Sequence, residues 1–129
     1  MFENVEFGSG NAELKNQKDL KERTKKFALS VISLSVFLPH TREAEVIARQ
    51  LIRSGTSVGA NYREASRARS KAEFIAKIGI VEQEADETLY WLELLQESKI
   101  VNPERLIDLT KEADELVAIF ATIGKKSKK

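Results

Sequence analysis

The stretch RSGTSVGANYREA, from Arg53 to Ala65, combines loop-like residues with a helical pattern. Two glycines, Gly55 and Gly59, stand four residues apart among small polar side chains. The apolar positions from Ala44 to Tyr62 nevertheless keep a heptad spacing through this stretch. A loop would have no reason to preserve that phase. The pattern therefore predicts one continuous helix that is thin at its glycines.

A thin helix has a physical purpose, because small side chains let a neighbouring helix approach closely. Each glycine inside a helix costs about 1 kcal/mol relative to alanine, so close packing must offset that cost. We expect Ser54, Gly55, Gly59 and Ala60 to leave room for that approach, and Val58 to pack beside them. A phosphate-binding loop would need a preceding strand and a following lysine, and the next lysine is Lys71. A flexible hinge at the glycines remains an alternative.

Residues typical of helix starts and ends divide the chain into four amphipathic segments. The first is expected to begin near Lys18 and to stop at Pro39, which cannot continue a helix. Thr41 can cap the second segment, and Ser70 with Glu73 forms a capping box for the third. Asn102 and Pro103 are typical of a helix start, and Gly124 is typical of a helix end.

The expected core consists of the residues that follow a heptad spacing in each segment. In the first two segments these are Leu20, Thr24, Phe27, Val31, Leu34, Leu38, Ala44, Ile47, Leu51, Gly55, Val58, Tyr62 and Ala65. In the last two they are Phe74, Ile78, Val81, Ala85, Thr88, Leu92, Leu95, Leu106, Leu109, Ala113, Leu116, Phe120 and Ile123.

These segments predict an all-α, antiparallel up-down-up-down four-helix bundle in one domain, residues 17–124. Residues 1–16 have no sustained period and are expected to form a mobile arm, while 125–129 (KKSKK) form a basic tail. The apolar run from Phe27 to Leu38 is shorter than the ~20 residues that a membrane helix needs, so a buried helix is expected and no membrane association. The chain has no cysteine, which suits a reducing cytoplasm.

Arginines of the second segment line the helix face opposite its core. They are Arg42, Arg49, Arg53, Arg63 and Arg67. One interpretation is a nucleic-acid-binding face made by Arg49, Arg53, Arg63 and Arg67, extended by Lys125 and Lys126, because arginine forks match phosphate oxygens.

The other interpretation is structural pairing between helices or subunits. Residues 42–69 carry six arginines against three glutamates, whereas 71–97 carry two lysines against seven acids. An acidic stripe on the third segment is the expected counterpart: Glu82, Asp86, Glu93 and Glu97. Glu45 is also placed to pair with Arg49 one turn later. The whole chain has a net charge of only +1, so both interpretations remain open.

Polar and aromatic residues also flank the predicted core. Gln50, Ser57 and Asn61 could hydrogen-bond across helices and set their register. Trp91 is expected to fill a bundle or subunit interface, with its N–H bonded to an acceptor. Stacking of Trp91 on a nucleic-acid base is the alternative.

The runs ARQLIRSGTSVGANYREASRARS and FIAKIGIVEQEADETLYWLELL resemble the bacterial four-helix-bundle family encoded within 23S rRNA intervening sequences. The resemblance covers about Phe27 to Val101. The matching residues are Gln50, Arg53, Ser54, Ser57, Val58, Asn61, Glu64, Ala65, Glu84, Glu87, Thr88, Tyr90, Trp91 and Leu92. A related branch contains the accessory variability-determinant proteins of diversity-generating retroelements.

The resemblance implies a homopentameric barrel of bundles. For the retroelement branch it also implies binding to RNA or DNA and to a reverse transcriptase. Catalysis is not expected, because the chain lacks cysteine and its one histidine, His40, follows Pro39 in a predicted turn. No Glu-x-x-His pair exists for a di-iron site, so neither metal nor cofactor is expected.

Overall fold

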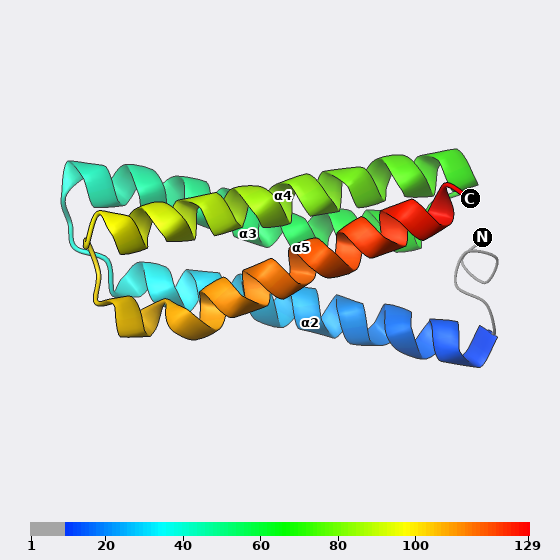
Figure 1. Cartoon of the computed structure of the whole chain (residues 1–129), viewed down its shortest axis with the longest axis horizontal. Helices are drawn as coiled ribbons and strands as arrows, with labels where there is room; N and C mark the ends of the chain where they lie inside the picture. The colour runs from blue at the N-terminus through cyan, green and yellow to red at the C-terminus, as the bar shows by residue number, and fades with distance from the viewer. Residues whose placement is uncertain (1–9) are drawn as a thin grey trace.

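A computed structural model describes residues 10–129, with side chains from Gln17 onward (Figure 1). The described part contains four long helices and no strand: α2 (Gly10–Val36), α3 (Arg42–Ser66), α4 (Lys71–Glu97) and α5 (Ile107–Ser127). A short 3-10 helix, η1 (Pro103–Arg105), precedes α5. The all-α class and the four helices predicted from the sequence are confirmed.

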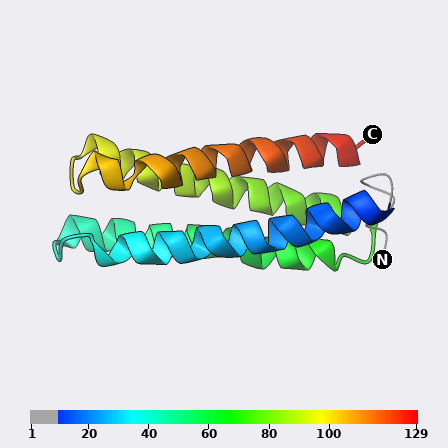
Figure 2. The same cartoon turned by 90° about the horizontal axis from the view of Figure 1, so that it is seen from below.

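The helices lie side by side, and each runs back along the one before it (Figures 1 and 2). Ion pairs record the direction for α3 and α4. Arg53 pairs with Glu87, whereas Glu64, further along α3, pairs with Lys77 near the start of α4. As α3 advances, its partners on α4 therefore move toward the start of that helix.

The first helix is longer at its start than its apolar pattern indicates. It begins at Gly10 instead of near Lys18, so residues 10–16 of the predicted arm are helical. Ala12, Glu13 and Leu14 are good helix formers, which lets the helix extend beyond its first core contact. The rest of the predicted arm, residues 1–9, lies outside the described residues.

Side-chain caps hold the starts of α3 and α4 as predicted. The Ala44 N–H donates to Thr41 Oγ1 at 3.2 Å, and the Glu73 N–H donates to Ser70 Oγ at 3.1 Å. Asn102 caps η1 instead of a long helix, accepting from the Glu104 N–H at 3.1 Å. These caps satisfy backbone donors that have no partner within their own helices.

The predicted core is almost entirely buried. Every expected core residue of α4 is buried, and α3 and α5 agree except at Ile47 and Ile123, which are half-buried. Leu20 of α2 is also half-buried. Tyr62 and Phe120 meet in the centre with their rings 5.5 Å apart.

The glycine stretch is an uninterrupted part of α3, and the two glycines face α2. A Cβ atom at Gly55 would lie 2.8 Å from Val31 Cγ2, which is closer than such atoms can approach. One at Gly59 would lie 3.4 Å from the backbone carbonyl carbon of Thr24. Ser54 and Val58 beside them are fully buried. The predicted close approach of two helices is therefore confirmed at the glycines, whereas Ala60 is exposed.

The apolar run from Phe27 to Leu38 is buried on one side only. Phe27, Val31, Leu34 and Leu38 face the core. The opposite side exposes Leu29, Ile32 and Val36, and Phe37, just past the end of the helix, is also exposed and packs against Arg105. The expectation of a buried helix is thus correct for one face and wrong for the other, because the remaining helices cover α2 from the core side alone. None of the helices within residues 10–129 is long and apolar enough to cross a membrane.

The last helix continues past Gly124 through most of the predicted basic tail. It ends at Ser127, whose hydroxyl is buried and donates to the Ile123 carbonyl at 2.8 Å. Lys125 and Lys126 lie in its last turn, where positive charge favours the helix dipole. The Lys71 ammonium donates to the Lys129 carbonyl at 3.0 Å. Residues 125–127 of the tail are therefore helical and Lys129 contacts the start of α4, although Gly124 was expected to end the helix.

Candidate functional site

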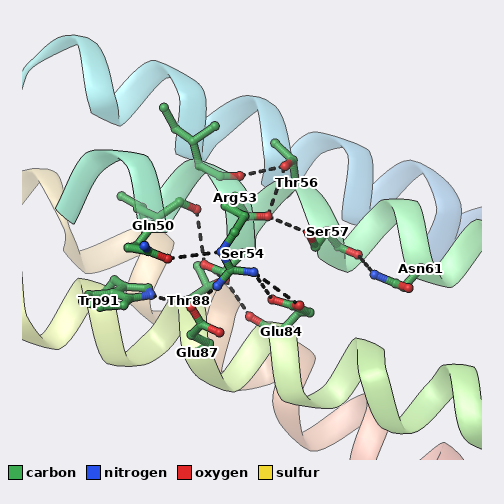
Figure 3. A network of polar contacts seen from close by, with 12 residues as sticks. Gln50, Arg53, Ser54, Thr56, Ser57, Asn61, Glu84, Glu87, Thr88 and Trp91 are labelled. Atoms are coloured by element: carbon green, nitrogen blue, oxygen red, sulfur yellow. Dashed lines mark hydrogen bonds and ion pairs between the residues drawn. The ribbon is translucent and has the colours of Figure 1, made fainter. Parts of the chain in front are cut away.

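A cluster of charged side chains joins α3 to α4 at the surface (Figure 3). Arg53 extends from α3 between two carboxylates of α4, with its guanidinium 3.2 Å from Glu84 and paired with Glu87. Its Nε also donates to Gln50 Oε1 at 3.1 Å. A planar guanidinium with several donors suits such a shared contact better than a lysine would.

Trp91 completes the cluster from the next turn of α4. Its indole Nε1 donates to Glu87 Oε2 at 2.9 Å, so this carboxylate oxygen accepts from both Trp91 and Arg53. Trp91 is half-buried, and the exposed Tyr90 packs edge-on against it with 5.1 Å between ring centroids. The predicted acceptor for the indole N–H is thereby identified as Glu87.

The bonds around Glu87 hold it in its charged form. Hydrogen bonds from Trp91 and then from Arg53 lower the pKa of the Glu87 carboxyl below its ordinary value. The hydrogen bond that Arg53 donates to Glu87 raises the pKa of the guanidinium in turn. Arg53 carries one positive charge against the two carboxylates, so the cluster keeps one negative charge that it does not compensate.

A buried pair of hydroxyl groups lies beneath this cluster. Thr88 Oγ1 and Ser54 Oγ are 2.9 Å apart, and both residues are fully buried between α3 and α4. Thr88 also reaches the Glu84 carbonyl at 2.7 Å, and Ser54 the Leu51 carbonyl at 3.4 Å. This pair, which the sequence patterns did not single out, is a direct polar link between the two helices.

Gln50, Ser57 and Asn61 do not set the helix register as expected. Ser57 Oγ donates to the Arg53 carbonyl at 2.7 Å, and Asn61 Nδ2 donates to the Ser57 carbonyl at 2.9 Å. Gln50 accepts from Arg53 on its own helix. These side chains bond within α3 because each can reach a backbone or side-chain partner about one turn away, which is closer than α4.

The arginines of α3 divide into two groups. Arg53 is paired across helices, as the structural interpretation predicts, but its partners are Glu84 and Glu87 instead of the predicted acidic stripe. Those two carboxylates lie on the side of α4 that faces α3. The stripe residues Glu82, Asp86, Glu93 and Glu97 make no ion pair within residues 17–129.

The second group is exposed and unpaired. Arg49, Arg63 and Arg67 make no ion pair with any described residue, and the predicted contact between Glu45 and Arg49 is not formed. Arg63 and Arg67 lie toward the end of α3, at the same end of the bundle as the last turn of α5 with Lys125 and Lys126 (Figure 1).

Hollows in the surface lie away from the charged cluster. Two of them lie between α2 and α5, with volumes of about 540 and 620 Å³. The larger has Leu20, Tyr62, Ile119 and Ile123 among its lining residues. In the part of the chain with described side chains, no three His, Asp or Glu residues gather as a metal site would require.

Comparisons with known proteins support the family resemblance that these residues showed in the sequence. The family model of the 23S rRNA-intervening sequence protein matches residues 16–122. A crystal structure of a protein with unknown function from the S23 ribosomal protein family of Bacteroides thetaiotaomicron is similar to the chain. It shares 38% identity with a TM-score of 0.76, over 82% of this chain and 98% of that one. No curated protein matches the chain significantly.

Proposed function

The chain belongs to the 23S rRNA-intervening sequence protein family, and on that premise we propose that it works without catalysis, as a homo-oligomeric assembly protein. The resemblance described above implies a ring of five copies. A cytoplasmic location, consistent with the absence of cysteine, is part of the same proposal.

This proposal rests on one observation, the position in the structure of the residues that match the family pattern. Residues of two separate runs, including Gln50, Arg53, Glu84, Glu87 and Trp91, come together in one cluster on the surface (Figure 3). Arginine and tryptophan are the residue types most enriched at the energetic centres of protein interfaces. A cluster of this composition supports a role in assembly.

The electrostatics of the cluster argue against acid–base catalysis there. A general acid or base works best with a pKa near the operating pH, which for a carboxyl group requires a raised pKa. Hydrogen bonds from Trp91 and Arg53 instead lower the pKa of Glu87. This carboxylate is therefore suited to holding a charged contact.

Size-exclusion chromatography with light scattering, recorded at 260 and 280 nm, tests the proposal. We expect a mass of several chains of 14.5 kDa each, five if the resemblance holds. Arg53→Glu should lower that mass, because it places three carboxylates together at the cluster. A wild-type mass of one chain would exclude the assembly proposal.

A second candidate function is that of an accessory scaffold which binds nucleic acid. The observation that favours it is that Arg49, Arg63 and Arg67 are exposed and make no ion pair with any side chain from Gln17 onward. Lys125 and Lys126 add positive charge at the same end of the bundle as Arg63 and Arg67. Arg53 is less suited to this role than the sequence suggested, because two carboxylates already occupy its guanidinium.

Fluorescence anisotropy with labelled RNA and DNA tests this second function. Arg63→Glu and Arg67→Glu should weaken binding, and each lost phosphate contact with duplex should reduce the salt slope by about 0.9. Lys111→Glu, at an exposed position on α5, is the matched charge reversal and should change binding less. If none of the three substitutions changed the affinity for RNA or DNA, this arginine face would not be the binding site.

A reverse transcriptase is a proposed partner only if the chain belongs to the retroelement branch. The net charge of +1 gives no general attraction for nucleic acid, so this partner rests on the resemblance alone. Co-purification with a reverse transcriptase encoded beside this gene would support that branch, and a neighbouring rRNA operon would favour the other.

A further inference from the structure

Helix α2 carries a second stripe of aligned residues on the side away from the core. Lys18, Lys25, Leu29, Ile32 and Val36 share one face of the helix at 100° per residue. The apolar members are exposed by 55% at Leu29, 44% at Ile32 and 75% at Val36. We call these five residues the outer stripe of α2. Its first half, which we call the basic half, carries Lys18 and Lys25 with Glu22 about 40° away on the same face, and its second half is apolar.

Among the described residues, no element of the same chain covers the outer stripe. The core side of α2 is occupied by α3, which approaches Val31 and Thr24 through its two glycines. Lys18 and Lys25 make no ion pair among the residues with described side chains. A soluble helix normally hides one apolar face, so a second one indicates a contact outside the chain.

The α3/α4 cluster has the complementary features. It keeps one uncompensated negative charge, from two carboxylates that share Arg53. Beside it lie the half-buried ring of Trp91 and the exposed ring of Tyr90, which offer apolar area. A surface with an acidic part and an aromatic part matches a stripe with a basic half and an apolar half.

The outer stripe and the α3/α4 cluster also match in their position along the bundle axis, which we call height. Heights within one chain follow from three contacts between neighbouring helices: Gly59 with Thr24, Gly55 with Val31, and Ser54 with Thr88. With a rise of about 1.5 Å per residue, Lys25 then lies within about half a turn of the height of Glu84, and Trp91 lies at a height between Ile32 and Val36. Lys25, at the end of the basic half, is thus near the height of Glu84, and the apolar half spans the height of the indole.

We propose that the outer stripe of α2 in one copy packs against the α3/α4 cluster of a second copy, with α2 parallel to α4. This inference rests on the proposed homo-oligomer and names its contact surfaces. Helices α2 and α4 run in the same direction within one chain (Figure 1). Copies related by rotation about an axis along the bundle keep their heights, so level residues meet. Two different surfaces in contact form a head-to-tail arrangement that can close into a ring.

The outward face of α4 is a poorer partner for the same stripe. At the height of the apolar half it presents Asp86 and Glu93, both exposed. Packing Ile32 and Val36 there would remove water from charges without pairing them. Against the basic half it would present Gly79 and Glu82, so the outward face is the poorer partner only where the apolar half would lie.

Substitutions on the outer stripe test the contact by light scattering. The double variant Leu29→Glu, Ile32→Glu should reduce the mass of the assembly to that of one 14.5-kDa chain, while helicity by circular dichroism stays unchanged because both side chains are exposed. Ile107→Glu is the matched control, since Ile107 is 61% exposed on α5 outside the stripe. An unchanged mass for the double variant would overturn the inference.

Cysteine cross-linking identifies which surfaces meet, because the natural chain has no cysteine. A chain with both Leu29→Cys and Ser57→Cys should give a ladder of linked species with a short bismaleimide. Each single variant should give none, because a head-to-tail contact brings residue 29 to residue 57 of another copy. Cross-linking of the Leu29→Cys variant alone would mean that α2 meets α2, and would overturn the inference.

The two proposals fail in different ways. A wild-type chain that is monomeric removes both the homo-oligomer and this contact. A wild-type oligomer that survives the stripe substitutions and gives no 29–57 cross-link removes only the contact described here.

Discussion

Helix α3 meets its two neighbours by different means. Against α2 it presents Gly55 and Gly59, and the contact depends on the absence of side chains. Against α4 it presents Ser54 and Arg53, and the contact depends on hydrogen bonds and charges. The first contact should therefore be sensitive to side-chain volume, and the second to polarity and pH. The predictions below test this difference.

The largest effect is expected at the glycine contact. Gly55→Val should lower the free energy of unfolding by about 3 kcal/mol, because the new side chain must overlap Val31. Gly79→Val is the matched control, since no atom lies within 4 Å of a Cβ at Gly79. It should change stability by about 0.5 kcal/mol or less, the difference in helix propensity. Chemical denaturation of both variants measures the difference.

Adding Val31→Ala to Gly55→Val should recover part of the lost stability, because it frees the space that the new side chain needs. If Gly55→Val and Gly79→Val proved equally stable, Gly55 would serve as a hinge or as a neutral position, and the close-approach explanation would be wrong.

A smaller effect is expected at the buried hydroxyl pair. Thr88→Val and Ser54→Ala should each cost about 1 kcal/mol, because each removes a hydrogen bond between buried groups. The double variant should lose less stability than the sum of the losses in the two single variants. Removing both hydroxyls leaves neither one buried without a hydrogen-bond partner. A double-mutant cycle by urea denaturation measures this coupling. Strict additivity would mean that the two hydroxyls do not interact.

The smallest effect is expected at Glu87, and it should depend on pH. Its pKa is lower in the folded chain than the ordinary value of 4.5, so its stabilising contribution is present above that value. The contribution is lost as the pH falls through the lowered pKa. Glu87→Gln should therefore be less stable than the natural chain at neutral pH, by about 1 kcal/mol or less for a partly exposed pair.

The difference between Glu87→Gln and the natural chain should shrink in acid, followed by urea denaturation at decreasing pH. Glu97→Gln is the control, because Glu97 is exposed and makes no ion pair among the described side chains. A pH-independent difference at Glu87 would show that the charged form of its carboxylate does not stabilise the fold.

Local patterns predicted the helices well and their ends less well. The caps at Thr41 and Ser70 form as expected, because a capping side chain bonds to a backbone only a few residues away. The predicted start of the first helix near Lys18 and the predicted end of the last at Gly124 were wrong. In the structure α2 begins at Gly10 and α5 ends at Ser127. Helix formers continue a helix past its last core contact, and Gly124 ends one only if the chain must turn there.

The candidate site was predictable in its residues more than in its pairings. The family resemblance selected Arg53, Glu84, Glu87 and Trp91, but charge counting assigned the arginines to a different acidic stripe. A difference of two residues on α4 changes the direction of a side chain by about 200°, which decides whether a carboxylate faces α3. That choice depends on how the two helices are rotated about their axes.

Residue order alone settles which faces of the helices are apolar, because a heptad spacing needs only the period of the helix. It also indicates that α3 must be thin at Gly55 and Gly59, since the phase continues through them. Tertiary structure decides which side chains meet across helices: Arg53 with Glu84 and Glu87, and Thr88 with Ser54. It also leaves the outer stripe of α2 exposed, because burial depends on how many helices surround a face, and periodicity carries no information about that number.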